Sequence, residues 1–166
     1  LGQLCASLLE AVPDVRFRVG SIEATEVDAL LIELMESSGG TLAPHLHMPL
    51  QSGADPVLRL MRRWHTREQY RVRALEIAER ISPLGLGADV ITGFPGETDD
   101  DHAVTRALIE EIPFTYLHVF PFSPRKNTVA ETLPRRVPQR VAGERARELR
   151  TLAQERGTLY RGSRSG

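Results

Sequence analysis

The amino-acid sequence predicts an α/β domain built on a parallel sheet. Short apolar runs near residues 15, 46, 89 and 117 indicate strands, and amphipathic stretches between them indicate helices. The interval between strands is about one strand–helix–strand unit, which favours parallel pairing. Four strands are too few for a closed eight-stranded barrel of about 250 residues. They form half of a barrel or part of an open sheet.

The first third of the chain predicts two helices and two strands. Residues 2–12 carry leucines at helical spacing, and residues 15–19 alternate apolar and basic side chains as a strand does. Residues 24–38 give the clearest helical stripe, which Thr25 and Asp28 could cap. Residues 45–50 predict a short second strand, followed by a polar loop.

Capping signals organise the rest of the chain. Thr66 with Gln69 and Thr98 with Asp101 predict capping boxes at the starts of two helices. Between these helices, an apolar run ending at Thr92 predicts a buried strand that stops in a turn rich in glycine and proline. Residues 115–121 predict the last strand and 122–134 a loop. Pro138 starts a final helix, which we expect Gly157 to end.

Composition excludes some classes of protein. The single cysteine, Cys5, excludes a disulfide framework and a cluster built from this chain's thiolates alone. No apolar run approaches the roughly 20 residues of a membrane helix, so we expect no membrane contact. We expect a cytoplasmic location on the chemistry described below. The first residues lack an initiator methionine, and we expect the chain to be part of a longer protein.

The net charge of −1 conceals two unlike parts. Residues 1–124 carry 10 Lys and Arg against 18 Asp and Glu, whereas residues 125–166 carry 11 against 4. A basic end on an acidic body is typical of contact with a polyanion such as RNA, although it also fits a solvated helix. We therefore divide the chain into a sheet-forming part, residues 1–134, and a basic helix and tail, residues 135–166.

Polar residues gather in the loops that follow the predicted strands. Ser21 and Glu23 follow the first strand, Gln51 and Ser52 the second, Gly93 the third and Arg125 the fourth. Parallel strands end at the same edge of a sheet, which is where α/β folds bind ligands. We expect a site there for a polar ligand with hydroxyls and an amine, such as a nucleoside joined to an amino acid.

The histidines allow a different interpretation. His45 and His47, with His118 and Asp89, resemble the metal ligands of barrel hydrolases. We expect the two side chains of the His45-x-His47 pair to point to opposite faces of their strand, which argues against a shared metal. The sequence therefore predicts no metal site, and the metallohydrolase remains an alternative.

Three motifs in order resemble the radical S-adenosylmethionine (radical SAM) methylthiotransferases. They are residues 44–53 (PHLHMPLQSG), 89–98 (DVITGFPGET) and 117–123 (LHVFPFS). The first and third are most similar to the subgroup that acts on N6-threonylcarbamoyladenosine in tRNA. The subgroup for isopentenyladenosine is the alternative within the family, and a non-catalytic RNA-binding module is the alternative outside enzymes.

The resemblance implies the C-terminal part of a partial (β/α)6 barrel, strands three to six. In this family a [4Fe–4S] cluster on a CxxxCxxC loop cleaves S-adenosylmethionine to a 5′-deoxyadenosyl radical. The radical activates C2 of the modified adenosine at tRNA position 37. A second cluster takes part in sulfur insertion. Neither three-cysteine loop is present here, so the chain is expected to be inactive alone and to need the N-terminal part of the same protein.

The same resemblance assigns the site residues. It places Ser21 and Glu23, Gln51 and Ser52, and Ile91 and Gly93 at the S-adenosylmethionine. Arg125, in the loop after the last strand, could bind phosphate, carboxylate or a cofactor, and we expect it at the substrate. The resemblance assigns no catalytic residue and no metal ligand to this chain. Departures from the family pattern are His102, the Lys126-Asn127 pair and the Trp64-His65 pair.

Overall fold

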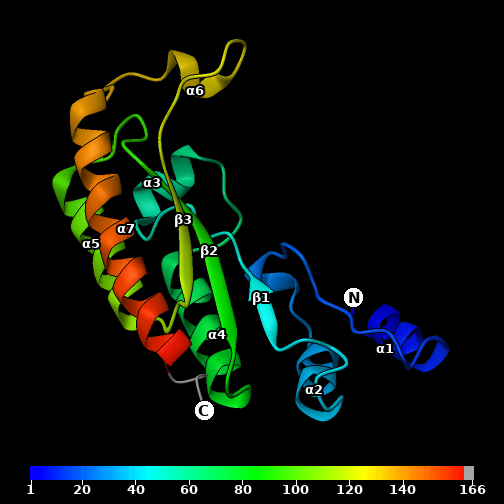
Figure 1. The fold of residues 1–166 in the computed structure, drawn as a ribbon. Coiled ribbons are helices and arrows are strands. Elements are labelled where there is room, and N and C mark those ends of the chain that lie inside the picture. Colours follow the sequence, from blue (N-terminus) through cyan, green and yellow to red (C-terminus); the bar gives the residue numbers. More distant parts are fainter. Residues whose placement is uncertain (163–166) are drawn as a thin grey trace.

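The computed structural model describes residues 1–162 and contains one sheet of three parallel strands (Figure 1). The strands are β1 (His45–His47), β2 (Gly85–Thr92) and β3 (Tyr116–Pro121), in the order β1-β2-β3. β2 lies in the middle and is hydrogen-bonded to both neighbours. The predicted α/β class and the parallel pairing are confirmed.

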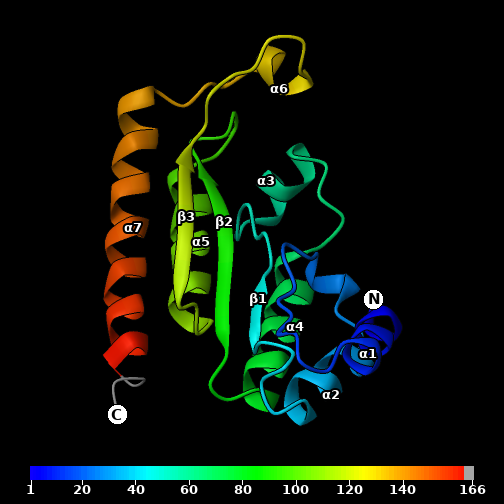
Figure 2. The same ribbon diagram turned by 45° about the vertical axis from the view of Figure 1, so that its right-hand side comes forward.

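Helices cover one face of this sheet (Figure 2). α3 (Asp55–Leu60) and α4 (Arg67–Arg80) connect β1 to β2, α5 (Asp99–Glu111) connects β2 to β3, and α7 (Gln139–Gly162) lies against β3 and β2. Alternate strand residues point into the core beneath them. The fully or almost fully buried ones are Leu46, Leu86, Ala88, Val90 and Val119.

The two predicted capping boxes are present. In each, the threonine hydroxyl accepts a hydrogen bond from the backbone N–H three residues on, and that residue's side chain accepts one from the threonine N–H. Thr66 with Gln69 starts α4, and Thr98 with Asp101 starts α5. Short-range signals of this kind are predictable because both partners lie within one helical turn.

The predicted strand at residues 15–19 is wrong. This segment makes a single bridge, Phe17 with Leu42, and the next bridge along the chain joins Ser21 to His47. The Phe17 N–H donates to the Thr41 carbonyl at 2.7 Å, and the next bond to the region of β1 runs from the Ile22 N–H to the His47 carbonyl at 3.0 Å. The backbone leaves the ladder between these two points, so no continuous strand forms.

The predicted helix at residues 24–38 is divided. A 3₁₀ turn, η1 (Ala24–Glu26), is followed by α2 (Ala29–Ser37), and α1 (Gly2–Ala11) packs beside α2. The break occurs because Asp28 is extended and accepts a hydrogen bond from the Leu31 N–H, which makes it the N-cap of α2.

The strand predicted at residues 45–50 is also shorter than expected. Pro49 has no N–H to donate, and the ladder stops after His47. Pairing resumes at one residue, where the Gln51 N–H donates to the Asp89 carbonyl and the Ile91 N–H donates to the Gln51 carbonyl.

Two differences concern the C-terminal half. The predicted loop at residues 122–134 contains a short helix, α6 (Val129–Thr132). α7 continues through Gly157, where a Cβ atom would lie 2.9 Å from the Thr115 carbonyl oxygen. That glycine therefore permits close packing on the sheet instead of ending the helix. The end of the predicted tail, residues 163–166, lies outside the described residues.

Across residues 1–162, no helix combines the length and apolar character needed to span a bilayer.

Asp28 gives a test of the N-terminal packing. Its carboxylate caps α2 and also accepts a hydrogen bond from the Gly2 N–H at 2.9 Å, so it joins the starts of α1 and α2. These backbone bonds lower the pKa of Asp28 to about 2. Replacing Asp28 by Ala is expected to lower the free energy of unfolding by about 1 kcal/mol at neutral pH, measured by urea denaturation.

Asp28→Asn is the control, because an amide keeps the capping acceptor and loses the charge. The folded pKa lies below the unfolded value near 3.8, so the charge-dependent stabilisation is complete above that value and disappears as the pH falls toward 2. The wild-type and Asp28→Ala stability curves should converge over this window. A constant difference between the curves would contradict the assignment.

Candidate functional site

The site lies on the sheet face that the helices leave open. Parallel register brings residues of one face together: His47 beside Gly87 and Tyr116, Asp89 beside His118, and Ile91 beside Phe120. Gln51 pairs with Val90 at the end of this face. The result is a polar and aromatic surface that runs along the strands toward their carboxyl ends.

A pocket of about 440 Å³ lies at the carboxyl end of this face. We call it the central pocket, and its lining includes Gln51, Asp89, Ile91, Phe120, Phe122 and Arg125. The aromatic and aliphatic side chains supply flat apolar walls, while Gln51, Asp89 and Arg125 supply polar groups. This combination of an apolar pocket with a few polar groups is typical of sites for small molecules.

Three of the predicted site residues meet at the central pocket. Gln51 reaches it from the segment after β1, Ile91 from β2, and Arg125 from the segment after β3. Gln51 has a left-handed backbone, with φ of 66°, and only 8% of its surface is exposed. The rule that parallel strands end at one edge predicts this convergence from the sequence alone.

The other predicted residues lie around this pocket and do not line it. The hydroxyl of Ser52 is buried against α5, 3.4 Å from the Thr105 hydroxyl. Ser21 pairs with His47, and Glu23 forms an ion pair with Arg63 at 3.0 Å. Gly93 is on the helix-covered side of the sheet.

Gly93 closes the end of β2 beneath α7. Its φ is 74°, and a Cβ atom there would lie 2.3 Å from the Cβ of Ala142. Its N–H donates to the carboxylate of Glu97, whose pKa is raised by burial. The Arg145 guanidinium lies 3.1 Å from that carboxylate and 2.6 Å from the carboxylate of Asp99. The buried Glu97–Arg145 pair thus stabilises the turn that follows β2.

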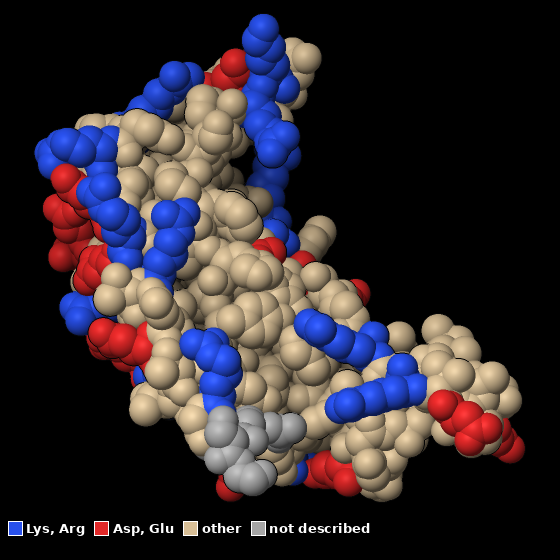
Figure 3. All heavy atoms as spheres, in the orientation of Figure 1, with Lys and Arg blue, Asp and Glu red and all other residues tan. Residues whose placement is uncertain are grey.

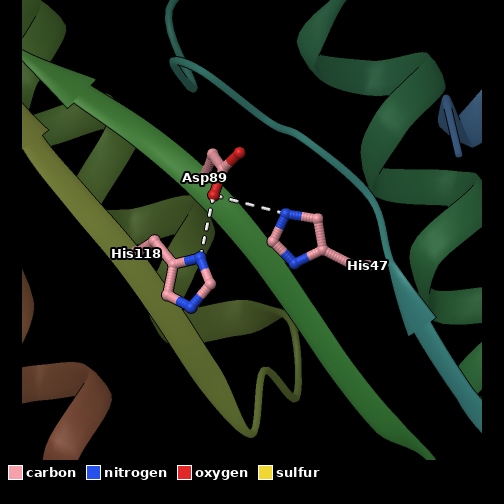
Figure 4. A group of neighbouring side chains, drawn as sticks. All are labelled: His47, Asp89 and His118. Carbon is pink, nitrogen blue, oxygen red and sulfur yellow. Dashed lines mark hydrogen bonds and ion pairs between the residues drawn. The ribbon is translucent and has the colours of Figure 1, made fainter. Parts of the chain in front are cut away.

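Three side chains of this face, His47, Asp89 and His118, converge on one another (Figure 4), and Asp89 also lines the central pocket. His47 Nε2 lies 3.3 Å from one oxygen of Asp89, and His118 Nδ1 lies 3.2 Å from the same oxygen. Within the described residues, this is the one group of three His, Cys, Asp or Glu residues whose atoms, within 4.8 Å of one another, could hold a metal ion. Sequence reasoning considered these residues only as metal ligands and missed Tyr116.

The expectation that His45 and His47 diverge is wrong. Residues two apart in a strand share a face. Both rings stack on Tyr116, with centroids 5.8 Å away. The Tyr116 hydroxyl lies 3.1 Å from His47 Nδ1 and 3.0 Å from His45 Nε2. Sharing a face does not make the pair a metal site, because His45 is directed to Tyr116 and Arg18 and stands outside the His47, Asp89 and His118 group.

One tautomer assignment satisfies the contacts among Asp89, His47, Tyr116 and His45. If His47 donates from Nε2 to Asp89, its Nδ1 accepts from the Tyr116 hydroxyl, whose oxygen then accepts from His45 Nε2. The Arg18 guanidinium lies 3.1 Å from His45 Nδ1 through Nε and 2.8 Å from His45 Nε2 through a terminal nitrogen, and in this assignment it donates to Nδ1 alone. Burial, followed by the nearby Arg18 charge, lowers the pKa of His45, and the ring is therefore neutral at neutral pH. A connected polar line thus runs from Arg18 to His118.

The comparisons with known proteins point to one family. The model of the radical SAM superfamily matches residues 7–109. A threonylcarbamoyladenosine tRNA methylthiotransferase from Aquifex aeolicus is 39% identical over 139 residues, which cover 84% of this chain and 34% of that protein. A tRNA-2-methylthio-N(6)-dimethylallyladenosine synthase from Anoxybacillus flavithermus is 38% identical over 156 residues, covering 93% of this chain and 29% of that protein.

A solved structure agrees in fold. The radical SAM enzyme coproporphyrinogen III oxidase from Escherichia coli superposes with a TM-score of 0.70 over 95% of this chain and 38% of the other, at 16% identity. That likeness supports the partial-barrel architecture alone. The chain spans about a third of the length of the curated relatives it matches.

The missing side chain at Gly87 makes the Tyr116 arrangement possible. A Cβ atom at Gly87 would lie 1.9 Å from the Tyr116 ring, which crosses β2 to reach the histidines of β1. Gly87→Ala is expected to displace this ring and to lower the free energy of unfolding by about 1–3 kcal/mol. Urea denaturation measures the loss, and the side-chain ¹⁵N resonances of His45 and His47 should shift.

Gly143→Ala is the matched control. A Cβ atom there meets no atom within 4 Å, and alanine in the interior of α7 is expected to stabilise the protein by up to about 1 kcal/mol. Equal effects of the two substitutions would mean that Tyr116 does not depend on the gap at Gly87.

Proposed function

Because the chain belongs to the radical SAM superfamily, we propose that it forms the C-terminal part of the partial barrel in a tRNA methylthiotransferase. The reaction proposed for the whole protein adds a methylthio group to C2 of N6-threonylcarbamoyladenosine at tRNA position 37. The observation that carries the proposal is the central pocket, where Gln51 and Ile91, from two of the three sequence motifs, line one cavity. Cytoplasmic location is part of the same proposal.

The central pocket fits the nucleoside part of S-adenosylmethionine. Its volume is within the usual range for small-molecule sites, about 300–1,000 Å³. Ile91 and Phe120 offer flat apolar contact for an adenine ring, and the Gln51 amide can bond ribose or backbone-like groups. When bound in the complete enzyme, S-adenosylmethionine would supply both the radical and the methyl group.

The remaining proposed cofactor residues act around this cavity. We assign Ser21 and Glu23 to the polar end of the ligand, because they precede β1 on the same side as His47. Ser52 orders the loop that follows Gln51, and Gly93 forms the turn that follows Ile91 at the end of β2. Arg125, exposed on the wall of the pocket, is proposed to contact the substrate.

The described residues do not fit an iron–sulfur cluster. A [4Fe–4S] cluster requires three or four thiolates, and the chain has one cysteine. Cys5 is buried in α1, and burial raises the pKa of its thiol. We therefore assign both clusters of the proposed enzyme to other parts of the same protein.

Dimethylallyladenosine is the second candidate substrate. Relatives named for that reaction, such as the one from Bacillus subtilis at 37% identity, are as similar to the chain as those named for threonylcarbamoyladenosine. The motif forms HLHMPLQSG and LHVFPFS favour threonylcarbamoyladenosine.

Ile91 tests the cofactor assignment. In the longer protein that contains this chain, Ile91→Asp would place a carboxylate against the adenine and is expected to weaken S-adenosylmethionine binding by roughly tenfold or more. Equilibrium dialysis with anaerobically reconstituted protein measures the effect. Val72→Asp, on the half-exposed face of α4, is the control and should bind normally. Equal affinity of both variants would remove the central pocket from the proposal.

Reconstitution tests the assignment of the clusters. The 166-residue chain incubated with iron and sulfide under argon is expected to show no [4Fe–4S] absorbance or electron paramagnetic resonance signal. A stable signal that disappears in Cys5→Ser would contradict our view that the ligands lie elsewhere.

A further inference from the structure

Unpaired cations gather near the carboxyl end of the strands. Within residues 1–162, the side chains of Arg59, Arg62, Arg125 and Lys126 make no hydrogen bond or ion pair. Arginines on the helix-covered side are mostly neutralised, for example Arg71 by Glu111, Arg80 by Glu36 and Arg145 by Glu97. Figure 3 shows Lys and Arg side chains gathered over the end of the molecule that carries α6.

An exposed tryptophan lies two residues from Arg62 in the same loop. Trp64 belongs to the loop that joins α3 to α4, residues 61–66, which we call the tryptophan loop. It is 94% exposed, and it is the one tryptophan in the sequence. An indole of this size held almost wholly in water forgoes the large favourable contribution of aromatic burial.

The residues on either side of Trp64 are anchored. Arg63 pairs with Glu23 at 3.0 Å, and its N–H donates to the Leu58 carbonyl. His65 is 4% exposed, with Nε2 3.3 Å from the Leu50 carbonyl oxygen and its ring centroid 5.5 Å from that of Tyr70. Burial lowers the pKa of His65, so this anchor is neutral at neutral pH. The contacts of Arg63 and His65 hold the backbone on both sides of Trp64, whose own side chain is exposed to solvent.

A second cavity joins the tryptophan loop to the central pocket. This outer pocket, of about 250 Å³, is lined by Arg62 and Arg63 on one side and Val129 on the other. It shares Gln51, Ile91 and Ala130 with the central pocket. The two cavities are therefore adjacent, and a ligand that occupies both would reach Arg62 and Arg63 of the tryptophan loop.

We propose that the tryptophan loop and its neighbouring cations bind a single-stranded loop of RNA, with Trp64 stacking on an unpaired base next to the nucleotide that enters the central pocket. This inference rests on the proposed function, which supplies the nucleotide in the pocket. Arg59 and Arg62 neutralise phosphates on one side of the cavities, and Arg125 with Lys126 do so on the other.

The chemistry favours an unpaired RNA loop over other polyanions. Aromatic side chains stack on splayed bases, worth about 1–3 kcal/mol per base, whereas the bases of a duplex are already stacked. An acidic protein would pair with the arginines and leave the exposed indole face without a flat partner. The two adjacent cavities could also accommodate neighbouring nucleotides of an RNA strand that crosses the surface.

Trp64 itself reports on the contact. The 166-residue chain is titrated with an RNA hairpin that has an unpaired loop, and separately with a fully paired duplex of equal length. Tryptophan fluorescence is expected to be quenched by the hairpin and not by the duplex. In parallel, fluorescence anisotropy of the labelled hairpin measures affinity. Trp64→Ala should weaken hairpin binding roughly 5- to 150-fold, and Trp64→Phe should weaken it less.

Two matched controls separate stacking and charge from general effects. Leu159→Ala removes another exposed apolar side chain, 75% exposed on α7, and should leave affinity unchanged. Arg62→Ala should reduce the slope of log affinity against log salt by about one, whereas Arg147→Ala, an unpaired arginine on α7, should not. Circular dichroism confirms that each variant is folded.

Several results would overturn the inference: unchanged affinity in Trp64→Ala, equal quenching by the duplex, no hairpin binding, or full displacement of the hairpin by polyglutamate at equal charge concentration. These outcomes are separate from the Ile91→Asp test. Normal dependence of S-adenosylmethionine binding on Ile91, together with no role for Trp64, would refute the RNA contact and leave the proposed function standing.

Discussion

The register of β2 with its two neighbours decides what the open face of the sheet can be. The pairing is parallel on both sides. Gly87 is paired with His47 of β1 and Tyr116 of β3, and Asp89 and Ile91 are each paired with a residue of β3. A shift of one residue would turn the helix-packing residues Leu86, Ala88 and Val90 toward the pocket. The buried face therefore enforces the arrangement of the polar face, and the fold and the site depend on the same hydrogen bonds.

The arrangement of the polar face depends on Gly87, which has no side chain. Gly87 contributes only space, and the ring of Tyr116 fills that space to reach both histidines of β1. Farther along β2, the Asp89 carboxylate lies close to His47 Nε2 and to His118 Nδ1. Asp89 also lines the central pocket, so the hydrogen-bonded residues and the pocket meet at this carboxylate, with Ile91 and Gln51 farther along.

Local signals and the meeting of strand ends were predictable from the sequence, and specific side-chain contacts between distant residues were not. The capping boxes at Thr66 and Thr98 depend on neighbours three residues away, and the convergence of Gln51, Ile91 and Arg125 follows from parallel pairing. The break at Asp28 and the loss of the strand at residues 15–19 depend on tertiary partners. The shared face of His45 and His47 was available from strand periodicity, but their contact with Tyr116, about 70 residues away, was not.

The contact between Gly93 and Ala142 has an evolutionary consequence. With a left-handed backbone at one position and a methyl group already touching it from α7, neither residue can grow without separating the helix from the strand. Selection is therefore expected to act on the two positions as a unit, although 48 residues lie between them in the sequence. Any lineage that acquires a larger residue at either position must also rebuild the Glu97–Arg145 pair beneath it, so this corner is expected to vary far more slowly than the exposed loops around it.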